Sequence, residues 1–330
     1  MRILIDYRPA LRERTGAGEY IRQLVRALAG LSPRPDITVF SSSWKDRLDA
    51  ADLPEIRTLD RRVPVRILNA AWHWLQWPPV ELLGGSPVDV THSPHPLMMP
   101  TRSGARVITI HDLDFLDHPE RTTREIRRDY TRLARRHATR ADRIIVPSRY
   151  TAEQVERRLG VPAGRISLCV PGAPGWPARS RLPADGYLLF VGTLGERKNL
   201  GTLLRAYGQI VERREGRAPE LLLAGRSTIE GDALLREVQR SSMAGKVRHL
   251  GYVPEERKKA LLEGAMLLVV PSLDEGFGLP ALEAMQLGVP VVAADRGALP
   301  EVVGPTGVLV DPENPDRAYR EQACFFSPDP

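Results

Sequence analysis

Short runs of apolar residues alternate with longer amphipathic stretches along almost the whole of this 330-residue chain. Buried parallel strands joined by helices produce this alternation, because each parallel connection must cross over the sheet and a helix makes that crossing. The pattern therefore predicts an α/β fold of doubly wound parallel sheets. At roughly 150 residues per domain, the length predicts two such domains.

The predicted strands fall into two groups, which a proline- and glycine-rich segment at 171–177 separates. Such a segment fits neither a helix nor a central strand. In the first group we expect strands at residues 2–6, 37–41, 88–92, 107–111 and 143–146, and helices at 20–28 and 124–136. In the second group we expect strands at residues 187–191, 220–224, 247–250, 266–270, 289–293 and 307–310. We therefore predict domains at 1–172 and 187–330, joined by a hinge at 173–186.

Composition excludes several other classes of protein. Hydrophobic residues make up 42% of the chain and charged residues 27%, which excludes disordered and collagen-like chains. Cys169 and Cys324 are too few and too far apart for a disulfide framework or a zinc knuckle, so we expect a reducing cytoplasm. No apolar run reaches the roughly 18 residues of a membrane span, and the first six residues lack the apolar core of a signal peptide.

The most informative segment is residues 274–285, which follows a predicted strand. Gly276 and Gly278, on either side of Phe277, allow the backbone to approach a ligand closely. Leu279 is followed by a proline, which suits the first turn of a helix. The free N–H groups of a helix start form an anion site, and that site suits a diphosphate.

Two acids flank this helix start, with Glu275 in the loop and Glu283 about one turn inside the helix. Carboxylates accept hydrogen bonds from pairs of hydroxyl groups, so these two side chains can hold two sugar rings. The alternative is that both acids only favour the helix dipole, as acids near a helix N-terminus commonly do.

The Glu-x7-Glu pair, the Ala-Met that follows it and the segments 288–293, 297–303 and 307–312 resemble the retaining nucleotide-sugar glycosyltransferases of family 4. This resemblance implies the GT-B fold, in which two Rossmann-like domains face a cleft, the first for the acceptor and the second for the donor. It implies that Glu275 binds hydroxyl groups of the donor sugar and Glu283 the ribose. It also implies a retaining reaction, for which we expect a front-face displacement in which the departing phosphate helps to deprotonate the acceptor.

A second segment, residues 189–199, places a glycine loop at Gly192 and the adjacent cations Arg197 and Lys198 between a strand and a helix. Only five of the 47 basic residues are lysines, so a lysine here is more informative than another arginine. The pair suits a leaving diphosphate, whose negative charge grows as the sugar bond breaks. The family has an Arg-Lys pair at this point, and a solvated charge pair is the alternative.

The resemblance assigns further parts of the donor site. The backbone of residues 276–279 is expected to line it, and Arg226 and Tyr252 to form the wall around the nucleotide base, where backbone groups can read the base instead. In the first domain, Gly16 and Gly18 open a helix and approach the donor phosphate or the acceptor. Two permissive glycines at a helix start are the alternative. A dinucleotide-binding loop is excluded there because the third glycine is absent.

Three histidines are associated with predicted strands of the first domain. His111 ends the strand at 107–111 and precedes Asp112. The family has a histidine after this strand that contacts the donor sugar near the reacting carbon. His92 and His95 come at the end of the preceding strand and are candidates for the acceptor pocket. A purely structural histidine is the alternative for each of them.

The Asp-x-Asp sequence at Asp112 and Asp114 is similar to the metal site of a different glycosyltransferase fold, but it lies in the wrong domain for the donor. Arg197 and Lys198 already supply the positive charge that a metal would bring. We therefore expect no metal, and no cofactor beyond the nucleotide-sugar donor as co-substrate.

Two features bear on partners. Trp72, Trp74 and Trp77 cluster with leucines, and the stretch 121–140 contains eight arginines. Such a surface suits peripheral contact with an anionic membrane, at the inner face of the plasma membrane, where a lipid-linked acceptor would be found. A core helix with a solvated arginine face is the alternative. No binding motif accompanies the net charge of +6, so no nucleic acid is expected.

These observations predict a retaining hexosyltransferase that uses a saccharide or lipid-linked acceptor in the synthesis of cell-surface polysaccharide or glycoconjugate. The resemblance favours mannose from GDP-mannose as the donor sugar, and glucose or N-acetylglucosamine from UDP stays open. The alternatives are a non-catalytic nucleotide-sugar-binding remnant and a nucleotide-sugar 2-epimerase of the same fold. The first arises because residues 315–330 do not follow the family pattern, so we expect truncated or atypical C-terminal helices.

Overall fold

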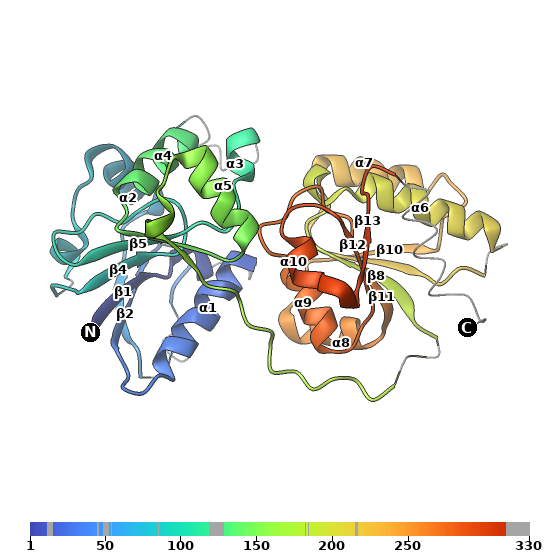
Figure 1. The fold of residues 1–330 in the computed structure, drawn as a ribbon, viewed down its shortest axis with the longest axis horizontal. Coiled ribbons are helices and arrows are strands. Elements are labelled where there is room, and N and C mark those ends of the chain that lie inside the picture. The colour runs from blue at the N-terminus through green and yellow to red at the C-terminus, as the bar shows by residue number, and fades with distance from the viewer. Residues whose placement is uncertain are drawn as a thin grey trace. The chain divides into compact units, whose positions relative to one another are not determined.

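The structure is a computed structural model that describes residues 1–11, 16–44, 46–48, 53, 55–84, 86–118, 129–181, 183, 185–214 and 217–314. The chain divides into two compact units, Met1–Pro171 and Gly172–Pro330, and each is built around one parallel β-sheet (Figure 1). The helix predicted at 124–136 lies partly outside the described residues, and the atypical segment 315–330 lies wholly outside them. The hinge predicted at 173–186 stays a prediction.

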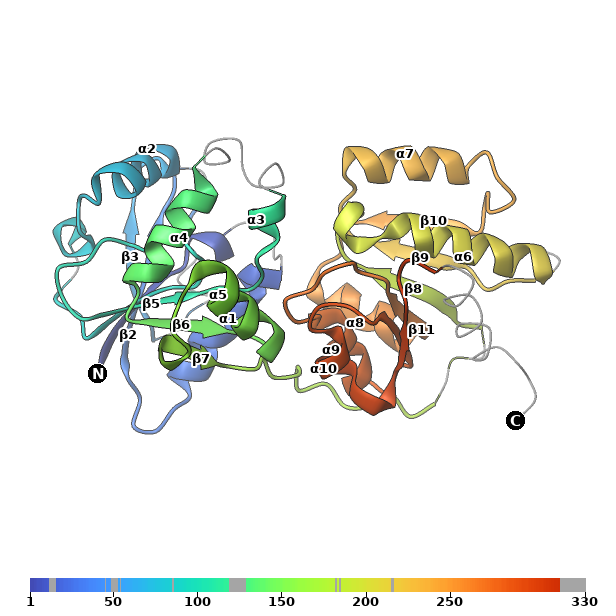
Figure 2. The ribbon, with the colours of Figure 1, turned by 45° about the horizontal axis from the view of Figure 1, so that its top comes forward.

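The sheet of the first unit has the strand order β3-β2-β1-β4-β5-β6-β7. Its strands are β1 (Arg2–Asp6), β2 (Asp36–Ser42), β3 (Arg57–Arg61), β4 (Val90–Ser93), β5 (Ala105–Thr109), β6 (Arg143–Val146) and β7 (Ile166–Leu168). One face carries α1 (Gly16–Ala29), and the other carries α2 (Val65–Ala70), α4 (Tyr130–Arg140) and α5 (Arg149–Leu159) (Figures 1 and 2). Shorter helical segments are α3 (Asp114–Asp117), 3-10 turns at Arg8–Ala10, Val80–Leu83 and Ala163–Arg165, and a π turn at Ala71–Leu75.

The side chains of β1 point alternately to the two faces of this sheet, and each set packs against a different helical segment. Ile3 and Ile5 belong to one buried cluster with Val25 of α1. Leu4, between them, belongs to another cluster with Trp72 of the π turn. Successive side chains of a strand point to opposite faces, so one short apolar strand supplies both cores of this half of the unit.

The sheet of the second unit has the strand order β10-β9-β8-β11-β12-β13. Its strands are β8 (Tyr187–Val191), β9 (Leu221–Ala224), β10 (Val247–Gly251), β11 (Ala265–Val270), β12 (Val291–Ala294) and β13 (Val308–Val310). One face carries α6 (Leu200–Arg213) and α7 (Ile229–Val238), and the other carries α8 (Glu255–Glu263), α9 (Leu279–Gln286) and α10 (Leu299–Val303) (Figure 2). Two 3-10 turns lie at Glu196–Lys198 and Gly304–Thr306.

The central strand β11 shows why strands of the second unit appear in the sequence as continuous apolar runs. Leu267 and Val269 pack in the cluster that contains α6, whereas Leu268 and Val270 pack in the cluster that contains α9. A parallel strand with helices on both faces must be apolar on both sides. The prediction of two doubly wound parallel-sheet domains is confirmed, and β1, β6 and β8 have the predicted bounds.

Two predicted strands of the first unit are wrong by about two residues. β4 is Val90–Ser93 rather than 88–92, and β5 is Ala105–Thr109 rather than 107–111. β5 begins earlier because Ala105 already donates a backbone hydrogen bond to Asp89, at 2.8 Å, although this end of the strand carries no apolar signal. His111 therefore lies two residues beyond β5 and does not end that strand.

Two strands escaped the sequence analysis, and both lie at an edge of the first sheet. β3 and β7 occupy the two ends of the strand order. Leu59 is the buried side chain of β3, whose other residues are charged or polar. An edge strand has one neighbour and can face solvent, so it does not need the continuous apolar run by which central strands are recognised.

Candidate functional site

Both sheets contain one point at which the direction of winding reverses, between β1 and β4 in the first unit and between β8 and β11 in the second. At such a switch point the loops after the two strands diverge to opposite faces, and ligands bind beyond the carboxyl ends of the strands. The predicted cations follow β8 and the predicted acid follows β11. Topology thus brings together Lys198 and Glu275, which lie 77 positions apart in the sequence.

The cation pair sits on a short turn that is tied to the loop after β11. Arg197 and Lys198 end the 3-10 turn after β8, and Asn199 continues the chain in the left-handed conformation. The backbone oxygen of Arg197 accepts from the N–H of Leu273 at 2.9 Å. Its Nη1 donates to the backbone oxygen of Asp274 at 3.0 Å. These bonds fix the cations beside the acid loop.

Glu275 is the centre of this cluster and is 7% exposed. Its Oε1 accepts from Nζ of Lys198 and, at 2.8 Å, from Oγ of Ser272, and Nη1 of Arg197 lies 3.5 Å from its Oε2. Burial alone would raise the pKa of Glu275, but the charges of Lys198 and Arg197 and the hydrogen bonds lower it. The side chain is therefore a carboxylate that can accept hydrogen bonds from hydroxyl groups. Sequence reasoning missed Ser272, which looks like an ordinary loop residue after a strand.

The segment between the acids turns sharply into α9. Gly276 and Phe277 are buried, and Gly278 precedes the helix with a φ of 104°, in the left-handed region. A Cβ on Gly278 would lie 2.7 Å from Cδ2 of Leu299. The helix begins at Leu279, and the backbone oxygen of Gly278 accepts from the N–H groups of Ala281 and Leu282 at 3.0 and 3.3 Å. The sequence prediction of a helix start next to the proline is confirmed.

The second acid, Glu283, lies inside α9 and is 8% exposed. Its Oε1 accepts from Nζ of Lys258, on α8, at 2.5 Å. The Lys258 ammonium also lies 5.9 Å from the ring centroid of Trp176. Sequence reasoning found the acid but neither of these partners, because Lys258 falls in an ordinary charged helix.

The remaining donor-site candidates of the second unit border the same strand ends. The guanidinium of Arg226, after β9, lies 5.9 Å from the ring centroid of Tyr252, after β10. Leu194 donates to the backbone oxygen of Arg226 at 2.7 Å. A Cβ on Gly192 would lie 3.5 Å from Cε of Lys198. Gly192 and Arg226 thus connect the turn that carries Lys198 to the residues expected around the nucleotide base.

In the first unit the structure brings His111 to the glycine-opened helix. Its ring meets that of Tyr20, on α1, edge-on with the centroids 4.8 Å apart, and its Nε2 lies 3.2 Å from the backbone oxygen of Pro94. Burial lowers the pKa of His111, so the ring is neutral. Gly16 and Gly18 fall inside the first turn of α1 rather than in a separate loop, and residues 12–15 lie outside the described part of the chain.

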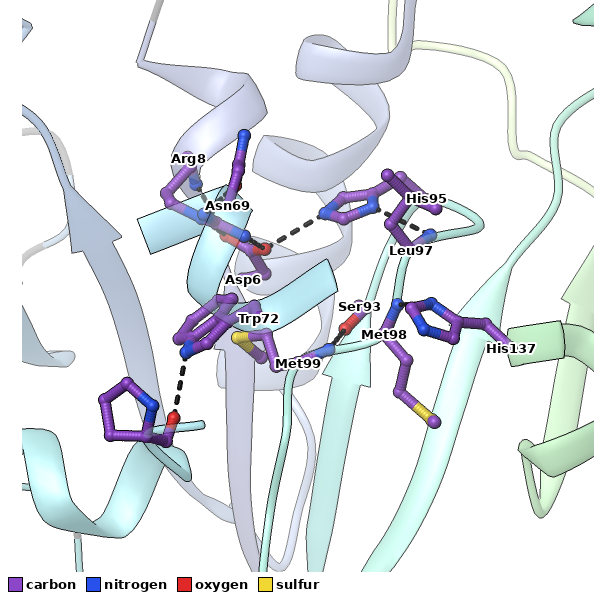
Figure 3. A network of polar contacts seen from close by, with 11 residues as sticks. Asp6, Arg8, Asn69, Trp72, Ser93, His95, Leu97, Met98, Met99 and His137 are labelled. Carbon is purple, nitrogen blue, oxygen red and sulfur yellow. Dashed lines mark hydrogen bonds and ion pairs between the residues drawn. The ribbon is translucent and has the colours of Figure 1, made fainter. Parts of the chain in front are cut away.

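The switch point of the first unit holds a buried network that the sequence analysis did not find (Figure 3). Asp6, the last residue of β1, is 0% exposed. The guanidinium of Arg8 donates to it twice, from Nε to Oδ1 at 2.9 Å and from Nη2 to Oδ2 at 2.6 Å, and the backbone N–H of Arg8 donates to Oδ1 at 3.1 Å. Burial alone would raise the pKa of Asp6, but the charge of Arg8 lowers it well below its ordinary value.

His95 completes this network with a defined tautomer. Its Nε2 lies 3.0 Å from Oδ2 of Asp6, and its Nδ1 accepts from the backbone N–H of Leu97 at 3.2 Å (Figure 3). Nδ1 therefore carries no proton, and Nε2 donates to the carboxylate. With both ring nitrogens engaged, His95 is fixed in place. His92 lies inside β4, with its Nε2 2.8 Å from Oγ1 of Thr109.

Arg8 is held on three sides. Its Nη1 donates to Oδ1 of Asn69 at 2.8 Å, and its guanidinium lies 4.6 Å from the ring centroid of Trp72. Trp72 is a core residue, 1% exposed, so it does not belong to the surface that was predicted from the three tryptophans. Trp74 and Trp77 are 56% and 57% exposed.

The described side chains and helices bear on metal binding and on membrane insertion. Within the described ranges, no group of three or more His, Cys, Asp or Glu side chains is placed so that it could hold a metal ion. Among the helices that the structure describes, none is both long and apolar enough to cross a bilayer. The expectation that no metal takes part stays a prediction.

Comparisons with known proteins cover nearly the whole chain. A family model described as "Glycosyltransferase Family 4" matches residues 14–173, and one described as "Glycosyl transferases group 1" matches residues 185–324. The second match includes residues 315–324, so the prediction that the chain departs from the family pattern after position 314 is wrong for these ten residues. O-antigen chain mannosyltransferase B of Escherichia coli is 31% identical, in an alignment that covers 96% of this chain and 88% of that protein.

Solved structures show the same architecture. Sucrose-phosphate synthase from Thermosynechococcus elongatus superposes with a TM-score of 0.78 at 22% identity, over 98% of this chain and 89% of that one. HepE of Anabaena, in complex with UDP and glucose, superposes with a TM-score of 0.69 at 18% identity, over 98% and 89%. At these identities the likeness concerns the fold, and it confirms the predicted GT-B class.

Proposed function

Since the chain belongs to the glycosyltransferases of family 4 and is a hexosyltransferase, we propose that it transfers mannose from GDP-mannose, with retention, in the synthesis of a cell-surface polysaccharide or glycoconjugate. The name of the 31% identical relative, O-antigen chain mannosyltransferase B, supports the mannosyl donor and the polysaccharide product. The observation that carries the proposal is the pairing of Lys198 and Arg197 with the buried Glu275 at the second switch point.

The donor would bind with its diphosphate at Arg197, Lys198 and the first turn of α9. Cations and helix N–H groups are the two kinds of group that bind phosphate in proteins. The lowered pKa of Glu275 keeps it ionised, so it accepts hydrogen bonds from the sugar hydroxyls. Glu283, one turn inside α9, is assigned to the ribose, and Arg226 and Tyr252 to the base.

The proposed reaction exchanges one bond at the sugar carbon for another on the same face. The bond from the anomeric carbon to the phosphate oxygen breaks, and a bond to the acceptor oxygen forms. The acceptor proton passes to the departing phosphate. Lys198 and Arg197 stabilise the negative charge that develops there, and this is the largest contribution expected of the chain. The proposal includes no metal and no cofactor besides the donor.

The acceptor is assigned to the first unit, whose strand ends carry neutral imidazoles rather than cations. Burial lowers the pKa of His92 to about 4 and that of His111 below its usual value. Neutral rings donate and accept hydrogen bonds, which suits the hydroxyl groups of a saccharide. His111, beside Tyr20, is assigned instead to the donor sugar, near the reacting carbon.

A lipid-linked acceptor would place the protein in the cytoplasm, at the inner face of the plasma membrane. Trp74, Leu75 and Trp77 are 56%, 72% and 57% exposed, and the guanidinium of Arg132, on α4, lies 5.3 Å from the ring centroid of Trp74. Exposed indoles beside arginines favour an anionic bilayer surface. We expect Trp74→Ala to lower co-sedimentation with phosphatidylglycerol vesicles and Trp44→Ala, also exposed, to leave it unchanged. Equal binding by both variants would contradict the membrane contact.

Calorimetry with GDP and UDP, followed by turnover assays, tests the donor proposal. We expect tighter binding of GDP and release of GDP from GDP-mannose when acceptor is supplied. Preference for UDP would replace mannose by glucose or N-acetylglucosamine as the candidate sugar. Binding of a nucleoside diphosphate without transfer to any acceptor would contradict the proposed activity and favour a non-catalytic binding protein. Inversion at C2 of the free donor would instead identify an epimerase.

A further inference from the structure

Two of the five lysines pair with the two glutamates that flank the start of α9. Lys198 donates to Glu275, and Lys258 donates to Glu283 at 2.5 Å. The other 42 basic residues of the chain are arginines. A chain that uses arginine almost everywhere thus has a lysine against each of these two acids.

Lys258 is enclosed where it meets Glu283. The side chains of the pair are 19% and 10% exposed. The ammonium also lies 5.9 Å from the ring centroid of Trp176. The backbone oxygen of Trp176 accepts from Nε2 of Gln286, in the last turn of α9, at 3.0 Å. The ammonium is therefore positioned by two elements besides its own helix.

The chemistry of the two cations explains why a lysine suits this position. An arginine fork binds a carboxylate through two parallel hydrogen bonds and engages both oxygens. An ammonium is a compact point charge, and here it contacts Oε1 of Glu283. An ionised carboxylate has about four acceptor positions, and the bond from Lys258 uses one of them. Without the ammonium, an acid that is 8% exposed would lose the cation that offsets the cost of burying its charge.

We propose that Lys258 is a positioning residue for the nucleotide, because it holds the Glu283 carboxylate in the orientation in which it accepts hydrogen bonds from the ribose hydroxyls. This inference rests on the proposed donor site, in which Glu283 binds the ribose. Lys258 acts through Glu283 and does not contact the reacting atoms. Its loss should therefore weaken binding of the donor much more than it slows the chemical step.

Calorimetry on the full chain tests the inference with three probes: GDP, its 2′,3′-dideoxy analogue and inorganic pyrophosphate. For Lys258→Gln we expect about 10- to 100-fold weaker binding of GDP, the range of a hydrogen bond to a charged group. Binding of pyrophosphate and of the dideoxy analogue should match that of the unaltered protein, since neither offers ribose hydroxyls. In turnover, KM for the donor should rise by a similar factor while kcat stays within about threefold.

Two further variants separate positioning from folding. Lys258→Arg preserves the charge and the fold but engages both carboxylate oxygens, so we expect it to weaken GDP binding while pyrophosphate binding and the thermal midpoint stay unchanged. Lys259→Gln is the matched control, because this neighbouring lysine pairs with Glu263 at 3.2 Å on the surface, and it should bind GDP normally.

The outcomes distinguish this inference from the proposed function. If the unaltered protein binds neither GDP nor UDP, the donor site itself is wrong, and the inference fails with it. If the unaltered protein binds a nucleoside diphosphate and both Lys258 variants bind it equally well, only the role of Lys258 is overturned. Equal loss of pyrophosphate and GDP would likewise overturn it, because the lysine would then serve the phosphates or the fold.

Discussion

The two switch points occupy the same place in two sheets of the same winding, yet their charges are arranged differently. Between β1 and β4, Asp6 is completely buried, and the side chain of its partner Arg8 is 10% exposed. Between β8 and β11, Glu275 is also buried, but the side chains of Lys198 and Arg197 are 16% and 25% exposed. We call Asp6 and Arg8 the closed pair, because both side chains are enclosed. We call Glu275 with Lys198 and Arg197 the open pair, because the two cations keep part of their surface accessible to solvent.

This difference shows that the same sheet topology can carry different arrangements of charge at its switch point. Arg8 donates hydrogen bonds to Asp6 and Asn69, and its guanidinium packs against the ring of Trp72. Its charge therefore stabilises the fold. Within the part of the chain that the structure describes, Lys198 pairs with Glu275, and its side chain is 16% exposed. The charges of the first switch point are therefore paired within the fold, and we expect the cations of the second to be available to a diphosphate.

The largest expected effect comes from breaking the closed pair. Arg8→Met leaves the Asp6 carboxylate buried without its cation, and we expect the free energy of unfolding of the first unit to fall by about 3–5 kcal/mol. Four of the five tryptophans lie in this unit, so urea unfolding followed by tryptophan fluorescence reports on it. The double variant with Asp6→Asn should recover part of the loss. A loss below about 1 kcal/mol would mean that the pair is not closed as described.

The next effect concerns catalysis at the open pair. Lys198→Ala should lower kcat/KM by ~30- to 1000-fold, or about 2–4 kcal/mol of transition-state stabilisation, as for the loss of one oxyanion donor. Lys246→Ala, which alters a lysine outside the site, is the control and should be close to the unaltered enzyme. Steady-state rates with saturating acceptor measure the difference. A Lys198 variant with normal kcat/KM would remove this residue from the site.

Local pattern was enough to predict the second switch point and not enough for the first. The cations of the turn after β8 and the acids around α9 lie next to glycines and after apolar strands, so each is visible within about ten residues. Asp6 and His95 lie 89 positions apart. The place of His95 after a strand made it a candidate, but nothing in the sequence marks Asp6 or its contact with His95. That contact arises only when β1 and β4 become neighbours in the sheet.

The partners of the acids show the same limit. Glu275 and Glu283 were found from their spacing, but Ser272 and Lys258 were not, since each is an unremarkable residue until the fold aims it at a carboxylate. Edge strand β3 was missed because it is mostly polar. The sequence pattern therefore predicts the elements and loops that apolar burial and glycine placement determine. The pairing of polar side chains can be found only from the three-dimensional arrangement.

A smaller effect should appear as pH dependence of the first unit. Burial lowers the pKa of His73 and His92 to about 4, whereas an unfolded imidazole titrates near 6.5. Between pH 6.5 and 4 the unfolded chain binds more protons, so stability should fall as pH falls, by about 1–3 kcal/mol per histidine. The lowered pKa of Asp6 matters only below about 4.

Urea unfolding at pH 7 and pH 4.5, read by tryptophan fluorescence, checks this dependence. His92→Asn should make it shallower, because a group that titrates differently in the two states is removed. The same change at His249, in the second unit, should leave it as it is. If His92→Asn has the same pH dependence as the unaltered protein, the imidazole of His92 is not kept neutral by burial.

The smallest expected effect compares two serines at corresponding places. Ser272 follows β11 and donates to Glu275 at 2.8 Å, whereas Ser93 ends β4 and accepts from the N–H of Met99 at 2.9 Å; both are 0% exposed. Ser272→Ala should lower kcat/KM by roughly 5- to 30-fold, or about 1–2 kcal/mol, since one hydrogen bond to an ionised group is lost. Ser93→Ala should lower the free energy of unfolding by about 1 kcal/mol and leave kcat/KM nearly unchanged. If the two variants lost activity equally, the two switch points would not divide into a closed structural network and an open binding site.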